Sequence, residues 1–339
     1  MGVTIKDVAK KAGVSTSTVS RVISDHPKIT EKTKQKVRKV MEELQFHINE
    51  NARNLVQKST KTIGIVMKSS ARESFHDPFF PEVLRGISAL CHNQDFSISL
   101  TTGESEDAIY QDVIKMVQGK KVDGIIVSYS KQDDKVVPYL LEYGIPFVVI
   151  GKPLGEANNI TYVDNDNVKA SREAAEFLIN RGHKKIGYIG GSLKFEVAKY
   201  RLQGFKEAVL LNQLNLTDDY MKNPESPDLI GKAVQELMAL NEPPTGIVAI
   251  DDLTALNSML ALREQHVNVP EDVSLVSFNN TIVSEFSNPP LTSIDTQIYQ
   301  LGYEAARCLI EEISQPSLYK RSIIIPTIMV ERESTKPLS

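Results

Sequence analysis

Apolar side chains recur at helical spacing in the first part of the chain. Over residues 5–12 they stand at i, i+3, i+4 and i+7, which places them on one helical face. Gly13 directly follows this stretch, and glycine tolerates the left-handed conformation that ends many helices. Ser15 and Thr30 can each cap a further helix, because a side-chain oxygen accepts a hydrogen bond from a free backbone N–H. The pattern predicts three short helices with a tight glycine turn between the first two, as in a helix-turn-helix domain.

From Thr62 onward, short apolar runs alternate with helical stretches, which predicts strands buried on both faces of parallel sheets. The expected strands are Ile63–Met67, Ile98–Leu100, Gly124–Val127, Phe147–Ile150, Ile186–Ile189, Gly246–Ile250 and Ser274–Phe278. The expected helices include Pro81–His92, Tyr110–Gln118, Asn167–Arg181, Tyr200–Leu211 and Thr254–Glu264. This many units fit two doubly wound lobes better than one closed barrel. Two such lobes that face each other form a cleft for a small polar molecule at the carboxyl ends of their strands.

The formal net charge of −4 on 339 residues conceals an asymmetry. Residues 1–60 carry 12 Lys and Arg against 6 Asp and Glu, a net of +6, whereas the remainder carries 27 against 37, a net of −10. A basic module on an acidic body favours a polyanionic partner for the first segment. A solvated basic face would produce the same charge, so charge alone leaves both interpretations open.

Composition and motifs argue against several other classes of protein. The N-terminus lacks a secretory signal, and no stretch approaches the roughly 20 apolar residues of a membrane-spanning helix. Only Cys91 and Cys308 are present, which favours a reducing compartment, so we expect a cytoplasmic protein without a membrane partner. Walker A, nucleophile-elbow and His-Glu-x-x-His motifs are absent, and adjacent carboxylates such as Asp251 and Asp252 would point opposite ways on a strand. We therefore expect no enzymatic activity, no metal and no cofactor.

A series of short motifs runs along the whole chain. The N-terminal motifs are Thr4-Ile5, Asp7-Val8-Ala9, Ala12-Gly13-Val14-Ser15 and Thr18-Val19-Ser20-Arg21-Val22. The later motifs are Asn49 through Leu55, Asp77-Pro-Phe-Phe, Asp164-Asn165, Arg181-Gly-His, Arg201-Leu-Gln-Gly-Phe and Pro290-Leu-Thr-Ser-Ile. In this order they resemble the LacI/GalR repressor family over nearly the full length. The resemblance implies an α/β protein with a three-helix helix-turn-helix domain, a hinge helix and a two-lobed, periplasmic-binding-protein-like effector domain with doubly wound parallel sheets.

The resemblance also implies a division of the chain. We expect a DNA-binding domain over 1–48, a hinge helix and linker over 49–60, and an effector-binding and dimerisation domain over 61–339. Within the last, lobe one should comprise about 61–163 and 294–324, and lobe two about 164–293 and 325–339.

Candidate DNA contacts follow from the same motifs. Thr16, Ser17 and Arg21 match positions that read bases, and an arginine can pair bidentately with guanine. Further DNA-binding candidates, several of them suited to phosphate contacts, are Thr4, Ser15, Thr18, Ser20 and Asn49. Without the surrounding motif, the Ser and Thr residues would be interpreted as helix caps and surface residues.

The hinge segment resembles a second DNA reader. Leu55 matches the leucine that each subunit of the family inserts into the minor groove, and Ala52 lies one turn earlier on the same face. Packing of Leu55 against its dimer mate is the alternative. Ile48 stands where the family usually has proline. Paired wedges imply a homodimer on a pseudo-palindromic operator.

Candidate effector contacts combine aromatic rings with planar hydrogen-bonding groups. They are Phe79, Phe80, Asp164, Arg201, Asp251 and Asn279. Asn279 stands where the family commonly has aspartate. Its side chain keeps an acceptor oxygen and adds an N–H donor. Core packing of one phenylalanine and a surface salt bridge of Arg201 are the alternatives.

Two short motifs, Val149-Ile-Gly-Lys-Pro and Ser277-Phe-Asn-Asn, resemble the branch of the family that represses maltose operons in Gram-positive bacteria. This implies a repressor controlled by a small sugar, maltose or a maltodextrin, whose binding closes the cleft and changes operator affinity. Whether the sugar raises or lowers operator affinity stays open. The alternatives are a regulator of this fold controlled by a protein corepressor, and a sugar-binding module without a DNA role.

Overall fold

The computed structural model describes residues 3–46, 59–155, 157–215, 217–317 and 319–338. The chain divides into two compact units, Met1–Lys61 and Thr62–Ser339. Each unit has its own hydrophobic core, and each is described separately below. The predicted hinge residues Asn49, Ala52 and Leu55 lie outside the described residues.

The first unit contains the three predicted helices. They are α1 (Ile5–Ala12), α2 (Thr16–Ile23) and α3 (Glu31–Glu43). Gly13 ends α1 with a φ of 66°, a left-handed conformation that glycine adopts without steric cost. The hydroxyl oxygens of Ser15 and Thr30 accept hydrogen bonds from the backbone N–H three residues later, which caps α2 and α3. The expected caps and the glycine turn are therefore confirmed.

Apolar residues from all three helices form the small core of this unit. Its buried members are Val8, Ala9, Ala12, Val19, Val22, Val37 and Val40. One basic residue of α3 departs from the outward pattern of the others, since the Lys34 side chain is only 7% exposed. Its aliphatic stem is covered by the protein, while its ammonium group forms ion pairs with Asp25 at 2.9 Å and Glu31 at 3.0 Å.

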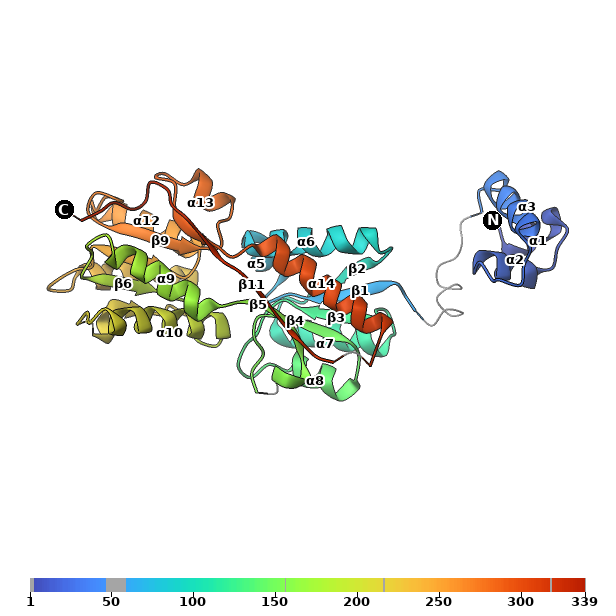
Figure 1. The fold of residues 1–339 in the computed structure, drawn as a ribbon, viewed down its shortest axis with the longest axis horizontal. Coiled ribbons are helices and arrows are strands. Elements are labelled where there is room, and N and C mark those ends of the chain that lie inside the picture. Colours follow the sequence, from blue (N-terminus) through green and yellow to red (C-terminus); the bar gives the residue numbers. More distant parts are fainter. Residues whose placement is uncertain (1–2, 47–58, 156, 216, 318, 339) are drawn as a thin grey trace. The chain divides into compact units, whose positions relative to one another are not determined.

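Lobe one of the second unit is a six-stranded parallel sheet in the order β11-β5-β4-β3-β1-β2. Its strands are β1 (Thr62–Val66), β2 (Ser97–Leu100), β3 (Gly124–Val127), β4 (Phe147–Ile150), β5 (Thr161–Asn165) and β11 (Ser322–Ile325). Its helices are α5 (Ala71–His76), α6 (Phe79–Asn93), α7 (Glu106–Gln118), α8 (Val136–Tyr143) and α14 (Ile298–Ser314). Separate cores cover the two sheet faces, with α6 and α14 on one and α7 and α8 on the other (Figure 1). The edge strand β2 is only partly buried, contrary to the expectation of burial on both faces, because it has a neighbour on one side only.

Lobe two repeats this plan in the order β12-β10-β9-β8-β6-β7. Its strands are β6 (Ile186–Ile189), β7 (Met221–Lys222), β8 (Gly246–Ala249), β9 (Ser274–Phe278), β10 (Thr292–Asp295) and β12 (Ile328–Val330). Its helices are α9 (Asn167–Ile179), α10 (Glu196–Leu211), α11 (Ile230–Met238), α12 (Asp252–Glu264) and α13 (Ile282–Phe286). Strand β12 pairs antiparallel with β10, so this sheet is mixed at one edge rather than wholly parallel. The α/β fold with two doubly wound lobes is confirmed.

Glycine allows the closest helix contact of lobe one. A Cβ atom on Gly302 of α14 would lie 2.1 Å from the carbonyl oxygen of Val83 in α6, and one on Gly86 would lie 2.0 Å from that of Tyr299. These positions therefore cannot carry a side chain without moving the helices apart.

The chain crosses between the lobes three times, after Asn165, Asp295 and Ile325. These crossings lie one or two residues later than expected, because β5 and β10 continue through polar residues that end the apolar runs. The side-chain amide of Asn165 donates hydrogen bonds to the carbonyl oxygens of Thr296 at 3.1 Å and Ile325 at 2.9 Å. A single buried side chain thus joins all three crossings and fixes the base of the interlobe hinge.

Candidate functional site

Helix α2 presents a polar surface at its N-terminal end. Thr16, Ser17 and Arg21 are exposed, while Thr18 and Ser20 are half-buried. Among the described residues, the Arg21 guanidinium has no hydrogen-bond or ion-pair partner. An unpaired arginine on an exposed helix face can turn toward an external acceptor without breaking a contact.

Two of the predicted DNA contacts also serve the fold. The Thr4 hydroxyl donates a 2.6 Å hydrogen bond to Asp7, whose pKa is lowered mainly by this contact. The Ser15 hydroxyl caps α2 and lies 3.2 Å from the Ser17 hydroxyl and 2.9 Å from that of Thr18. Both side chains remain exposed, so capping and an external contact are compatible.

The six predicted effector residues line one cavity between the lobes. Phe79, Phe80, Asp164, Arg201, Asp251 and Asn279 all contribute to its wall, and its volume is about 640 Å³. Lobe one contributes the ends of β1, β3 and β4, and lobe two contributes the ends of β6 and β8. This is the strand end at which open α/β sheets bind ligands.

Arg201 is the most constrained of these residues. It is 5% exposed, and its Nε atom donates a 2.9 Å hydrogen bond to the side-chain oxygen of Asn167. Its Nη1 atom donates to the Ile250 carbonyl, and the guanidinium lies 4.3 Å from the centre of the Phe278 ring. Burial lowers the pKa of Arg201. No carboxylate of the described residues forms an ion pair with it, so the surface salt bridge considered from sequence is wrong.

Asp164 is bonded within the chain at both oxygens. It accepts hydrogen bonds from the backbone N–H of Lys152 at 2.9 Å and Asn165 at 2.8 Å, and from the Asn167 amide at 3.0 Å. Burial outweighs these contacts and raises the pKa of Asp164 to about 6. Asp164 and Asn167 thus form a chain of polar contacts that ends at Arg201.

The two phenylalanines at the start of α6 differ in their surroundings. Phe80 is 5% exposed and belongs to the core of lobe one, where its ring makes an edge-on contact with Phe75 at 5.4 Å. Phe79 is half-buried against the same core. Both rings border the cavity, so core packing and an effector contact coexist here.

The remaining candidates lie in lobe two. Asp251 caps α12 by accepting a 2.7 Å hydrogen bond from the Thr254 N–H. Asn279 has a φ of 98° and is 9% exposed, and its side-chain oxygen accepts a 3.3 Å hydrogen bond from Thr296. In lobe one, burial raises the pKa of Asp77, and the charge of Asp251 adds to this effect. The cavity therefore carries acidic groups from both lobes.

The cavity is also lined by residues that were not predicted, and Lys68, Tyr129, Asn167 and Phe195 are four of these. Three of them follow the strands β1, β3 and β5 within two residues. Their position after a buried strand was a usable signal, since such residues gather at one sheet edge.

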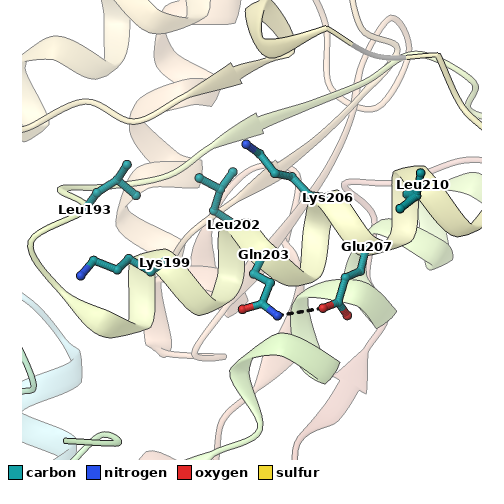
Figure 2. A pocket seen from close by; sticks show the side chains of 7 residues that line it. All are labelled: Leu193, Lys199, Leu202, Gln203, Lys206, Glu207 and Leu210. Carbon is teal, nitrogen blue, oxygen red and sulfur yellow. Dashed lines mark hydrogen bonds between the residues drawn. The ribbon is translucent and has the colours of Figure 1, made fainter. Parts of the chain in front are cut away.

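A second, smaller hollow lies on the outer surface of α10 and contains none of the predicted residues. Figure 2 shows its lining, which is Leu193, Lys199, Leu202, Gln203, Lys206, Glu207 and Leu210. Among the described residues, no helix is long and apolar enough to span a membrane, and no three His, Cys, Asp or Glu side chains are grouped as metal ligands.

Comparison with known proteins decides the family. Residues 4–49 match the model of bacterial regulatory proteins of the lacI family, and residues 175–335 match that of the periplasmic binding protein-like domain. The chain is 45% identical over 321 residues to the HTH-type transcriptional regulator MalR of Streptococcus pneumoniae, covering 93% of this chain and 94% of that protein. The chain belongs to the LacI family of DNA-binding transcriptional regulators.

Other LacI-family proteins match this regulator over nearly its full length. MalR of Staphylococcus xylosus is 36% identical over 334 residues, which is 98% of each chain. The solved complex of the transcriptional regulator CelR with cellobiose has a TM-score of 0.77 at 29% identity, and the match covers 98% of this chain and 99% of that chain. The predicted family and fold are therefore confirmed, and this regulator shares both its DNA-binding and its effector-domain folds with characterised relatives.

Proposed function

We propose that this LacI-family regulator is a cytoplasmic repressor of sugar-utilisation genes, controlled by maltose or a short maltodextrin bound between its lobes. The division into 1–48, 49–60 and 61–339 is part of the proposal. The observation that carries it is the convergence of a buried, rigidly held arginine with aromatic and acidic side chains in one cleft of about 640 Å³.

The chemistry of the cleft suits a neutral polyhydroxylated ligand. The Arg201 Nη2 atom donates to no acceptor among the described residues, so it is available for a sugar hydroxyl. Asp251 and Asp77 supply acceptor oxygens, and Phe79 supplies an apolar surface for a sugar ring. The names of the MalR relatives and the cellobiose in the CelR complex support a glucose-containing oligosaccharide.

DNA recognition is assigned to α2. Thr16, Ser17 and Arg21 would read bases, while Ser15, Thr18 and Ser20 would contact the phosphate backbone. Thr4 is a further proposed DNA contact. In the hinge, Leu55 would enter the minor groove with Ala52 on the same face, and Asn49 is a further proposed DNA contact.

A homodimer is part of the proposal, because a pseudo-palindromic operator needs two symmetric readers. The short helix α13 exposes two large apolar side chains one turn apart, Ile282 at 66% and Phe286 at 75%. Such a pair on lobe two favours burial against a second copy of the chain.

Calorimetric titration of the purified protein with maltose, maltotriose and glucose tests the ligand. We expect maltose or maltotriose to bind more tightly than glucose, and Arg201→Ala to weaken binding at least tenfold. Arg263→Ala, which removes an exposed arginine from α12 of the same lobe, serves as the control and should bind normally. Equal affinities of wild type and Arg201→Ala would overturn the assignment of the cleft.

A further inference from the structure

Two loops from opposite lobes pair directly beside the cavity. The backbone N–H of Gln132 donates a 2.8 Å hydrogen bond to the Lys194 carbonyl, and the N–H of Glu196 donates a 3.1 Å bond to the Ser130 carbonyl. Together they form an isolated antiparallel bridge centred on Lys131 and Phe195. We call residues 130–132 and 194–196 the clasp. It lies far from the three chain crossings in sequence, so it is an independent link between the lobes.

Phe195 gives the clasp an apolar anchor. Phe195 belongs to lobe two, yet its half-buried ring packs against the core of lobe one that α7 and α8 help to form. The Lys68 ammonium of lobe one lies 4.2 Å from the centre of this ring, within the range of a cation–π contact. Opening the lobes would expose the ring and remove its cationic neighbour.

Charged contacts hold each half of the clasp on its own lobe. Lys131 is 9% exposed at its side chain and pairs with Glu106 at 2.7 Å in lobe one. Glu196 is 6% exposed and pairs with Lys199 at 2.7 Å in lobe two. Each half is therefore held on its own lobe by an ion pair, and Lys199 also donates a 3.5 Å hydrogen bond across the clasp to the side-chain oxygen of Gln132.

The clasp also forms part of the cavity wall, since Ser130 and Phe195 both line it. A ligand that bridges the lobes and a clasp that joins them favour the same closed state. When only the closed state binds ligand well, the apparent affinity falls in proportion to the closed fraction.

We infer that Phe195 and the clasp hold the cleft closed, so that Phe195 is a positioning residue for effector binding and for the response to it. This inference rests on the proposed function only for the identity of the ligand. Breaking the clasp should lower the closed fraction even when no sugar is present.

Amide hydrogen exchange of the full-length protein measures the clasp directly, because its two donors are backbone amides. Phe195→Ala should accelerate exchange in the lobe-one segment containing Gln132, with and without maltose, and should weaken maltose binding about tenfold. Leu193→Ala is the matched control, because Leu193 stands in the same loop but lines the outer hollow on α10 (Figure 2). Unchanged exchange at Gln132 in Phe195→Ala would refute the inference, whether or not maltose binds the wild type.

A reversible cross-link separates the clasp from any direct contact between Phe195 and the ligand. Lys131 and Phe195 form a non-hydrogen-bonded antiparallel pair, with Cα atoms about 4.5 Å apart in such pairs, which is within disulfide range. The natural cysteines are both buried and do not compete. In Lys131→Cys/Phe195→Cys, oxidation should suppress exchange at Gln132 and abolish any effect of maltose on operator affinity, and reduction should reverse both. An oxidised protein with fast exchange, or one that still answers to maltose, would contradict the role of the clasp.

Discussion

The side-chain oxygen of Asn167 accepts a 2.9 Å hydrogen bond from the Nε atom of Arg201, and this contact connects the hinge with the effector cleft. Asn167 begins α9 directly after the first crossing between the lobes. Its amide nitrogen also donates to Asp164 at 3.0 Å, so the asparagine is fixed from both ends. A displacement of the crossing would therefore move the arginine.

Asn167→Ala should weaken sugar binding about tenfold, because Arg201 loses the acceptor that orients it and the site must order it on binding. Calorimetry with maltose measures the effect. Asn180→Ala, which changes the residue after the other end of α9, is the control. A normal affinity in Asn167→Ala would show that the Ile250 carbonyl and Phe278 orient the arginine without Asn167.

The pH dependence of stability should report Asp164. Because burial raises its pKa to about 6 from 3.8, the folded protein binds this proton more tightly than the unfolded chain. Its favourable contribution is fully present below about pH 4 and is lost as the pH rises to 6 and beyond, on the order of 3 kcal/mol in total. Urea unfolding between pH 4 and 7 should show a smaller loss of stability with rising pH in Asp164→Asn than in the wild type. Identical slopes would contradict the raised pKa.

The sequence predicted local structure well where one short segment contains the whole signal. Gly13 and Ser15 determine the turn and the cap of the first unit, and the apolar runs such as Gly124–Val127 are strands with the expected bounds. Helix α14 is central to the core of lobe one and was not among the helices named from the sequence, although its buried residues recur at helical spacing.

Long-range polar contacts could not be predicted in the same way. Asn165 and Thr296 are 131 residues apart, and nothing in either neighbourhood indicates that they meet. The clasp likewise depends on how two loops from different lobes face each other. The family resemblance supplied the cleft candidates, whereas the contacts that position them required the structure.

Arg21→Ala should abolish sequence-specific operator binding and leave weak, salt-sensitive binding to any DNA, because a bidentate base contact is lost while phosphate contacts remain. Filter binding at two salt concentrations, with operator and random DNA, measures the specific and the non-specific affinity. Lys10→Ala removes the same charge from α1 and should retain specificity. Undiminished operator affinity in Arg21→Ala would refute the assignment of α2 as the reading helix.

Phe286→Lys should convert the proposed homodimer to a monomer, since a charge replaces an apolar side chain that is 75% exposed in the single chain and lies in the proposed interface. Sedimentation velocity at micromolar concentration detects the change. Leu210→Lys on α10, where the leucine is 77% exposed, should leave the dimer intact. A dimeric Phe286→Lys protein would place the interface elsewhere on the chain.

A single titration shows whether a sugar controls operator binding. The full-length protein is titrated onto labelled pseudo-palindromic DNA selected by the protein itself, with and without maltose, maltotriose and glucose. We expect maltose or maltotriose to change operator affinity about tenfold or more, a coupling of about 1.4 kcal/mol, and glucose to change it less. Tight operator binding that no sugar alters would contradict this expectation and assign control of the repressor to a different effector.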